Sequence, residues 1–228
     1  AQGRPLYESL GFAAIGHAQQ FHGHWQPSAE AGPSSSIAAD ELTRLMQPQD
    51  VPDLLAYDQR ERGLARPALL QALLAQMDAD ERCAVSVDAH GRLCGYGILR
   101  RFGRGWVVGP LLADGADRAV ALVKRLTQER TGDFIRIDLA AHTRAFPDSQ
   151  AQAQAGHDRS SAQDHDRDAD VLANYLQAHG LALVDQPTTM IRLAASRSDT
   201  GAPAGNGSQS APQARTATVC ALAAQALG

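Results

Sequence analysis

The stretch "RGWVVGPLLADGADRAVALVKRL", residues 104–126, carries the clearest pattern of this 228-residue chain. Its first ten residues form a strand-length run that is apolar enough to be a central strand of a sheet. The following residues place Val120, Val123 and Leu126 on one face of a helix that is expected over 116–130. A central strand followed by an amphipathic helix predicts a sheet with helices packed on its faces.

The flanking sequence extends this pattern in both directions. Upstream, we expect a strand, two helices and a two-stranded hairpin, at 42–46, 48–61, 69–77 and 83–100. Downstream, we expect a strand, a helix ended by Gly180 and further strands, at 134–139, 171–179, 181–184, 189–193 and 219–224. From residue 42 to the strand at 189–193 the predicted order is β-α-α-β-β-β-α-β-α-β-β, with 219–224 as a further last strand, and it gives a mixed sheet of the α/β (α+β) class.

Composition excludes several classes of protein. The formal net charge is −4 and no block of Lys or Arg stands out, which argues against a nucleic-acid partner. No apolar run reaches the roughly 18 residues of a membrane span, so no membrane partner is expected. The three cysteines form no CxxC pair, which is typical of reduced thiols and predicts a cytoplasmic protein without a metal site.

Three polar segments divide the chain. Residues 26–36, "QPSAEAGPSSS", have the composition of a linker. Residues 142–168 and 195–215 are of low complexity and are expected to be disordered insertions within a domain that spans 37–228.

A short internal similarity concerns the residues before the linker. "LYESLGF" at 6–12 and "YLQAHGL" at 175–181 both read as the end of a helix, a glycine and the start of a strand. With Gly11 aligned to Gly180, Leu6 falls on Tyr175 and Tyr7 on Leu176. Residues 1–25 are therefore expected to be the C-terminal remnant of a first domain, too small to fold independently, joined to a second and complete copy.

The sequence resembles the GNAT superfamily of CoA-dependent N-acetyltransferases, in particular the tandem-domain bacterial members. The resemblance rests on "RPLYESLGF", "LAYDQRERGLARPALLQALL", "GRLCGYGILR", "VVGPLLADGADRAVALV" and "CALAAQALG". It implies a GNAT-like, mostly antiparallel sheet flanked by helices. It also implies acetyl-CoA as co-substrate, a small-molecule or peptide primary amine as acceptor, a missing first GNAT domain as partner and, as a further option, a homodimer.

The resemblance also assigns a proton donor for the departing CoA thiolate, a tyrosine on the last helix. In the remnant this position is Tyr7. In the complete domain it is Leu176, which has no proton to donate, and the neighbouring Tyr175 lies about 100° further around the helix.

The cofactor tract follows from the same resemblance. The strand residues Val108, Leu111 and Leu112 would line the pantetheine arm. Gly115, Ala116 and Arg118 would stand at the pyrophosphate, at the start of a helix. The family signature Arg/Gln-x-x-Gly-x-Gly/Ala is not matched in either register of "LLADGADRA", and Asp114 and Asp117 would oppose the phosphates. The alternative is that "ADGAD" is a helix start with acidic residues on the helix dipole.

The acceptor pocket is implied at the junction of the first two helices, at Asp58 and Arg66, with Tyr96 on a neighbouring strand. The alternative for the two charges is a solvated helix end, and for Tyr96 simple packing. His22, His24 and Trp25 are expected to be exposed strand residues.

Two functions remain open from the sequence. The first is an acetyl-CoA-dependent N-acetyltransferase, an acyltransferase whose first domain carried the active site. The second is a degenerate, non-catalytic GNAT-like domain that serves in packing, dimerisation or ligand sensing. The acceptor substrate is not specified by either reading.

Overall fold

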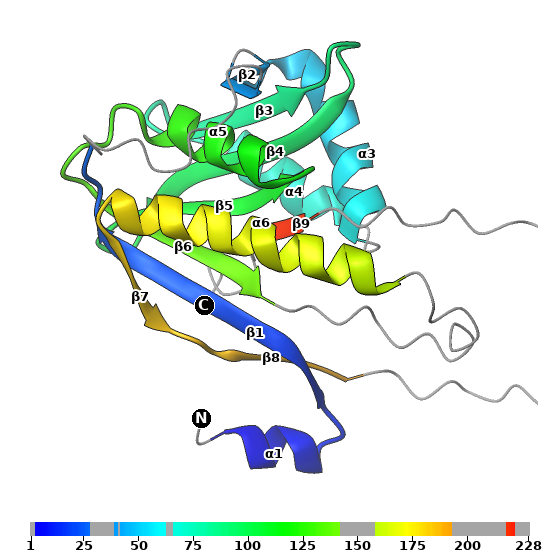
Figure 1. Ribbon diagram of the computed structural model, residues 1–228. Coiled ribbons are helices and arrows are strands. Elements are labelled where there is room, and N and C mark those ends of the chain that lie inside the picture. The colour runs from blue at the N-terminus through cyan, green and yellow to red at the C-terminus, as the bar shows by residue number, and fades with distance from the viewer. Residues whose placement is uncertain are drawn as a thin grey trace, which may run out of the picture.

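The computed structural model describes residues 3–27, 39–40, 42–62, 66–141, 158–192 and 218–221. Most of the expected linker at 26–36, residues 142–157 and the expected insertion at 195–215 lie outside this part of the chain. In chain order the elements are α1 (Arg4–Ser9), β1 (Ala13–His24), β2 (Thr43–Leu45), the 3-10 turn η1 (Pro48–Asp50), α3 (Val51–Arg62), α4 (Pro67–Ala75), β3 (Arg82–Val87), β4 (Leu93–Phe102), β5 (Gly105–Ala113), α5 (Ala116–Thr127), β6 (Phe134–Ala141), α6 (Asp158–Ala178), β7 (Leu181–Asp185), β8 (Thr188–Ile191) and β9 (Thr218–Ala221) (Figure 1).

A single sheet organises the described residues. Its strands run in the order β2-β3-β4-β5-β6-β1-β7, with β8 beside β1 and β9 beside β5. Every pairing is antiparallel except that of β5 with β6. The element order from β2 onward and the central place of β5 confirm the predicted mixed, mostly antiparallel sheet flanked by helices.

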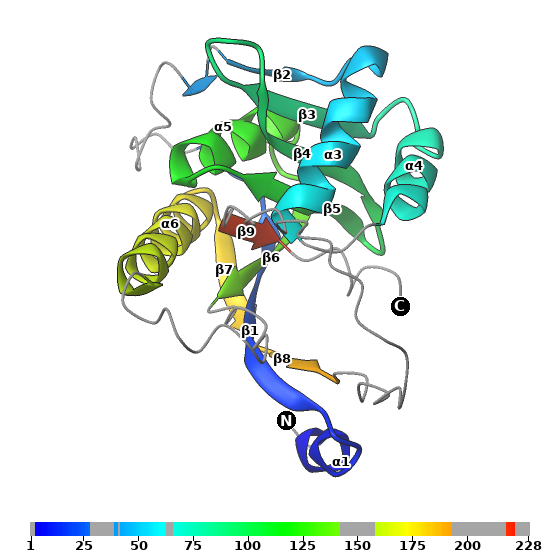
Figure 2. The ribbon, with the colours of Figure 1, turned by 90° about the vertical axis from the view of Figure 1, so that its right-hand side faces the viewer.

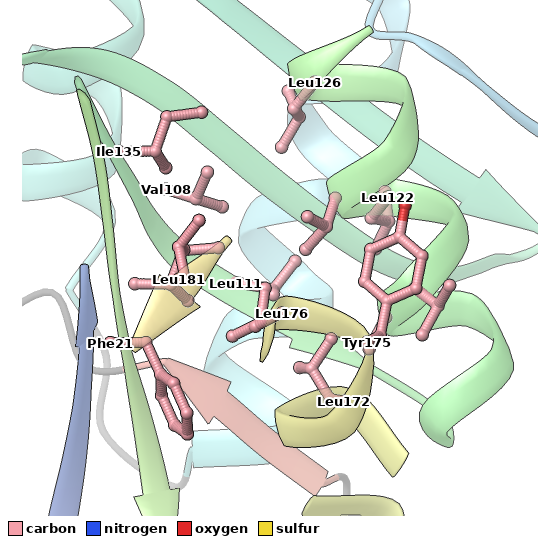
Figure 3. Close-up of a cluster of buried hydrophobic side chains, with 14 of the residues drawn as sticks. Phe21, Val108, Leu111, Leu122, Leu126, Ile135, Leu172, Tyr175, Leu176 and Leu181 are labelled. Carbon is pink, nitrogen blue, oxygen red and sulfur yellow. The ribbon is translucent and has the colours of Figure 1, made fainter. Parts of the chain in front are cut away.

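Helices cover both faces of the sheet and bury one core on each (Figure 2). On one face, α5 and α6 pack on a core that contains Phe21, Val108, Leu122, Ile135 and Leu176 (Figure 3). On the other, α3 and α4 cover a second core, whose members include Leu54, Tyr57, Leu70, Tyr96, Ile98 and Leu112. Because successive side chains of a strand point to opposite faces of the sheet, alternate residues of a strand enter one core or the other.

β1 lies inside this sheet, between β6 and β7. Phe21 pairs with Ile137 of β6 and with Leu183 of β7, and its side chain is 1% exposed. Without β1, β6 and β7 would each present an unpaired edge at this point. Residues 13–24 therefore share a folding unit with the rest of the described chain, and the boundary expected at residue 25 does not separate two folded units.

The two similar helix–glycine–strand junctions have matching backbones. Gly11 follows α1 with a φ of +84°, and Gly180 follows α6 with a φ of +86°, both in the left-handed region that glycine adopts without strain. The helices differ in burial, however. Tyr175 and Leu176 are 6% and 0% exposed, whereas Leu6 and Tyr7 are 62% and 49% exposed.

α6 is longer than the sequence pattern predicts. It begins at Asp158, inside the segment 142–168 that was expected to be an insertion, so this expectation is wrong for its C-terminal part. Residues 158–168 contain no Gly or Pro and include Ala, Gln and Arg, which are good helix formers. They extend a helix that is already fixed by the packing of Leu172 and Leu176.

Among the described residues, no helix is long and apolar enough to cross a membrane.

At the end of β1, His24 is exposed as expected, whereas Trp25 is not. Trp25 is 4% exposed and stacks on His179, with ring centroids 4.8 Å apart, so it is a core residue and not an exposed one. His24 pairs through Nδ1 with the carbonyl oxygen of Gly132 at 2.9 Å. These contacts come from α6 and from the turn before β6, far away in sequence.

Truncating a β1 core residue tests whether this strand is integral to the fold. We expect Phe21→Ala to lower the free energy of unfolding by about 3–5 kcal/mol, because it removes a ring from a fully packed site. Urea unfolding followed by circular dichroism measures this change, with Leu10→Ala, at the 52% exposed C-cap position after α1, as the control. A loss for Phe21→Ala as small as that of the control would mean that β1 is only loosely attached.

Candidate functional site

β5 and β6 are paired over only part of their length. The parallel ladder joins Trp106–Val108 to Ile135–Ile137. Beyond it, Pro110 has no N–H to donate, and the carbonyl oxygen of Gly109 accepts a bond from Nε of Arg100 at 3.3 Å. The two strands then separate, and β9 pairs antiparallel with β5 at Leu111–Ala113.

The strand residues expected to line a cofactor turn their side chains into the two cores. Val108 and Leu111 belong to the core under α5 and α6, and Leu112 belongs to the core under α3 and α4. Each of the three is at most 1% exposed. Only the backbone of β5 is therefore available to a ligand along this tract.

The N-terminus of α5 opens into a cavity of about 520 Å³. Gly115 is the N-cap residue, with a φ of +98° and no side-chain capping bond, and Asp117 lies in the first turn. Asp168 of α6 also lines the cavity, with Oδ2 4.0 Å from the place that a Cβ on Gly115 would occupy. A helix N-terminus normally attracts an anion, and here carboxylates of the chain itself stand beside it.

Two other residues of this segment are engaged elsewhere. The Tyr57 hydroxyl donates to Oδ1 of Asp114 at 2.7 Å, which ties the loop before α5 to α3. Burial, with help from this carboxylate, raises the pKa of Tyr57 well above its usual value, so the hydroxyl remains a proton donor. Arg118 donates through Nη1 to Oγ of Ser86 at 3.1 Å and to the carbonyl oxygen of Val87 at 3.0 Å. Its guanidinium is therefore bonded to β3.

Asp58, Arg66 and Tyr96 come together in one buried cluster. Arg66 donates to both carboxylate oxygens of Asp58, at 2.9 and 2.6 Å, and the Tyr96 hydroxyl donates to Oδ1 of Asp58 at 2.6 Å. Asp58 is only 1% exposed, so these are not the solvated helix-end charges of the alternative interpretation. Burial and the Asp58 carboxylate raise the pKa of Tyr96 far above its usual value. The charges of Asp58 and Arg66 are therefore paired within the cluster.

The two tyrosines considered as proton donors are engaged in other contacts. Tyr7 is on α1, and its ring meets the edge of Phe12 at a centroid distance of 5.5 Å. Tyr175 packs beside Trp25 and His179, and its hydroxyl points towards α5 (Figure 3). Burial raises the pKa of Tyr175, which makes it a weaker acid. Leu176 fills the aligned position of α6 and is fully buried.

Sequence reasoning missed Tyr57 and Asp168. Tyr57 follows from helical periodicity, since it lies three residues after the buried Leu54, whereas Asp168 lies in the segment 142–168 that was expected to be an insertion. Among the described residues, no group of three or more His, Cys, Asp or Glu side chains is arranged to hold a metal ion.

The comparisons with known proteins agree with this architecture. Residues 54–165 match a family model described as Acetyltransferase (GNAT) domain. The uncharacterized N-acetyltransferase YitH of Bacillus subtilis (strain 168) is 31% identical over 148 residues, which cover 65% of this chain and 49% of YitH. The chain thus spans about half the length of this curated relative.

Solved structures support the same fold. A putative acetyltransferase from Pyrococcus horikoshii superimposes with a TM-score of 0.51 and 14% identity, over 83% of this chain and 50% of that one. A GCN5-related N-acetyltransferase from Sphaerobacter thermophilus gives a TM-score of 0.51 and 13% identity, over 84% and 56% of the two chains. At these identities the likeness concerns the fold alone.

The contribution of the buried ion pair between Asp58 and Arg66 to the free energy of unfolding can be tested. We expect Arg66→Ala to lower the free energy of unfolding by about 3–5 kcal/mol, because it leaves the Asp58 carboxylate buried without its cation. Chemical denaturation measures the loss. Arg4→Ala removes the arginine of an exposed ion pair with Glu8 and is expected to have almost no effect. Equal effects of the two substitutions would contradict the role assigned to the buried pair.

Proposed function

Because the family model, the curated relative and the solved structures support a GNAT acetyltransferase domain in this chain, we propose that the chain serves an acetyl-CoA-dependent N-acetyltransferase. The acyl group would pass from CoA to a primary amine. Within that activity, we assign the domain described above the non-catalytic role and place the chemistry in a first GNAT domain.

The arrangement at the N-terminus of α5 carries this proposal. Acetyl-CoA would bring its pyrophosphate to this helix start, where Asp117 and Asp168 already line the cavity. Each carboxylate opposes a phosphate charge by about 1 kcal/mol at 4 Å in water, and by more where water is partly excluded. Arg118 lines the same cavity but donates two of its bonds to β3, so acidic side chains outnumber cations at this helix start.

The chemistry of acyl transfer points the same way. An amine with a pKa near 10.4 must lose a proton before it attacks the thioester, which costs about 4.6 kcal/mol at pH 7. The departing thiolate must then gain a proton, and a positioned acid is typically worth about 10²–10⁴ in rate. Leu176 offers no proton, and Tyr175 is buried against α5.

The proposed first domain would contact this chain through α1. Leu6, Tyr7 and Leu10 are 62%, 49% and 52% exposed, although the aligned Tyr175 and Leu176 are buried in the core. A helix and its C-cap residue that together expose three large apolar side chains favour a partner surface. Residues 1–12 would then be the end of that domain, and β1 would connect it with the present sheet.

A second candidate is that this domain is itself catalytic. The polar cluster of Asp58, Arg66 and Tyr96, beside β4, favours this candidate because it supplies ionisable groups where an acceptor would enter. Measurable transfer of acetyl groups to an amine by this chain alone, abolished by Tyr96→Phe, would decide for it.

The cellular location we propose is the cytoplasm. The buried free thiols of Cys83 and Cys94 are compatible with its reducing conditions.

Calorimetry with acetyl-CoA tests the non-catalytic assignment. We expect a dissociation constant weaker than about 10 μM, or about −7 kcal/mol, for the chain. Replacing Asp117 and Asp168 together by Asn should tighten binding about tenfold or more, because two opposing charges are removed. The matched control is Asp53→Asn in the first turn of α3. A constant below about 10 μM for the unmodified chain would contradict the proposal.

A further inference from the structure

β9 occupies the one edge of β5 that its neighbour β6 leaves open. The register pairs Leu111 with Ala221, Leu112 with Val219 and Ala113 with Thr218. β9 also lies against β6 and α6, so it fills the space where the two parallel strands separate (Figure 2). The segment that closes this space thus comes from the far C-terminal side of the chain.

We infer that β9 is a displaceable strand that regulates access to the backbone of β5. The inference rests on the proposed function, because the ligand that competes with β9 is taken to be the pantetheine arm of acetyl-CoA. When β9 pairs with Leu111–Ala113, the arm is excluded. When β9 leaves, the same backbone groups are free to bind it.

The chemistry of the edge supports this competition. The side chains of Leu111 and Leu112 are fully buried on opposite faces, so only backbone N–H and C=O groups face the space. Such groups recognise any extended chain that carries amides, whether a peptide strand or another ligand. The pantetheine arm is extended and contains two amide groups. One row of donors and acceptors therefore fits both ligands, but only one at a time.

Within residues 218–221, which the structure describes, the attachment of β9 is short. Three residue pairs join these four residues to β5, and the register shifts between Leu111 and Leu112. The neighbouring strand β4, in contrast, pairs with β5 over seven residue pairs. A ligand can therefore compete with β9 without breaking the central ladder.

A pair of prolines in β9 tests the inference in the full chain. Successive N–H groups of a strand point to opposite sides, so Val219→Pro with Cys220→Pro removes the donor that faces β5 in either orientation. We expect the dissociation constants of acetyl-CoA and of pantetheine to fall at least tenfold. The matched control, Val219→Thr with Cys220→Val, keeps both N–H groups and should leave the two constants unchanged.

Hydrogen exchange of the backbone amides provides an independent test of whether β9 is displaced. In the unmodified chain, saturating pantetheine should speed exchange at residues 218–221 while Leu111–Ala113 stay protected, because the ligand replaces the strand. In the proline variant without ligand, exchange at Leu111–Ala113 should rise, and protection in β4 should show that the sheet is intact.

Two results would overturn the inference. One is protection of 218–221 that persists with pantetheine bound. The other is freer exchange at Leu111–Ala113 in the proline variant without tighter binding of pantetheine. The proposed function is judged separately, by the dissociation constant of acetyl-CoA for the unmodified chain, so the two can fail independently.

Discussion

β5 and β6 are hydrogen-bonded only over Trp106–Val108 and Ile135–Ile137, and Pro110, which has no N–H, follows on β5. Parallel strands that separate in this way leave unpaired backbone groups, and such groups require a partner. The placement of β9 depends on this separation, because β9 pairs with β5 where β6 does not. The competition inferred for the backbone of β5 is therefore a consequence of where one strand pairing stops.

The other half of the sheet depends on β1. This strand is the first of the chain, yet it lies between β6 and β7, and its Phe21 and Trp25 enter the core under α5 and α6. α1 precedes β1 as α6 precedes β7, with a left-handed glycine at each junction. The same local unit is buried in one case and exposed in the other, because only α6 has a helix and a sheet face to pack against.

Local patterns predicted the elements of this fold, and the central place of β5 followed from its apolar run. The sequence predicted that Asp58, Arg66 and Tyr96 lie near one another, but not their hydrogen bonds. Those bonds depend on how α3, α4 and β4 pack. The position of β1 could not be predicted, since strand order depends on long-range pairing. The bond of Arg118 to β3 likewise depends on tertiary contacts.

The central claim is that carboxylates of the chain itself take the place of a phosphate at α5. Titration of the isotopically labelled full chain with inorganic pyrophosphate, followed by the NMR signals of the backbone amides of Gly115–Arg118, tests it most directly. We predict no saturable shift up to about 10 mM, a concentration at which even a free energy of binding near −3 kcal/mol would show. Saturable shifts confined to these amides would contradict the account.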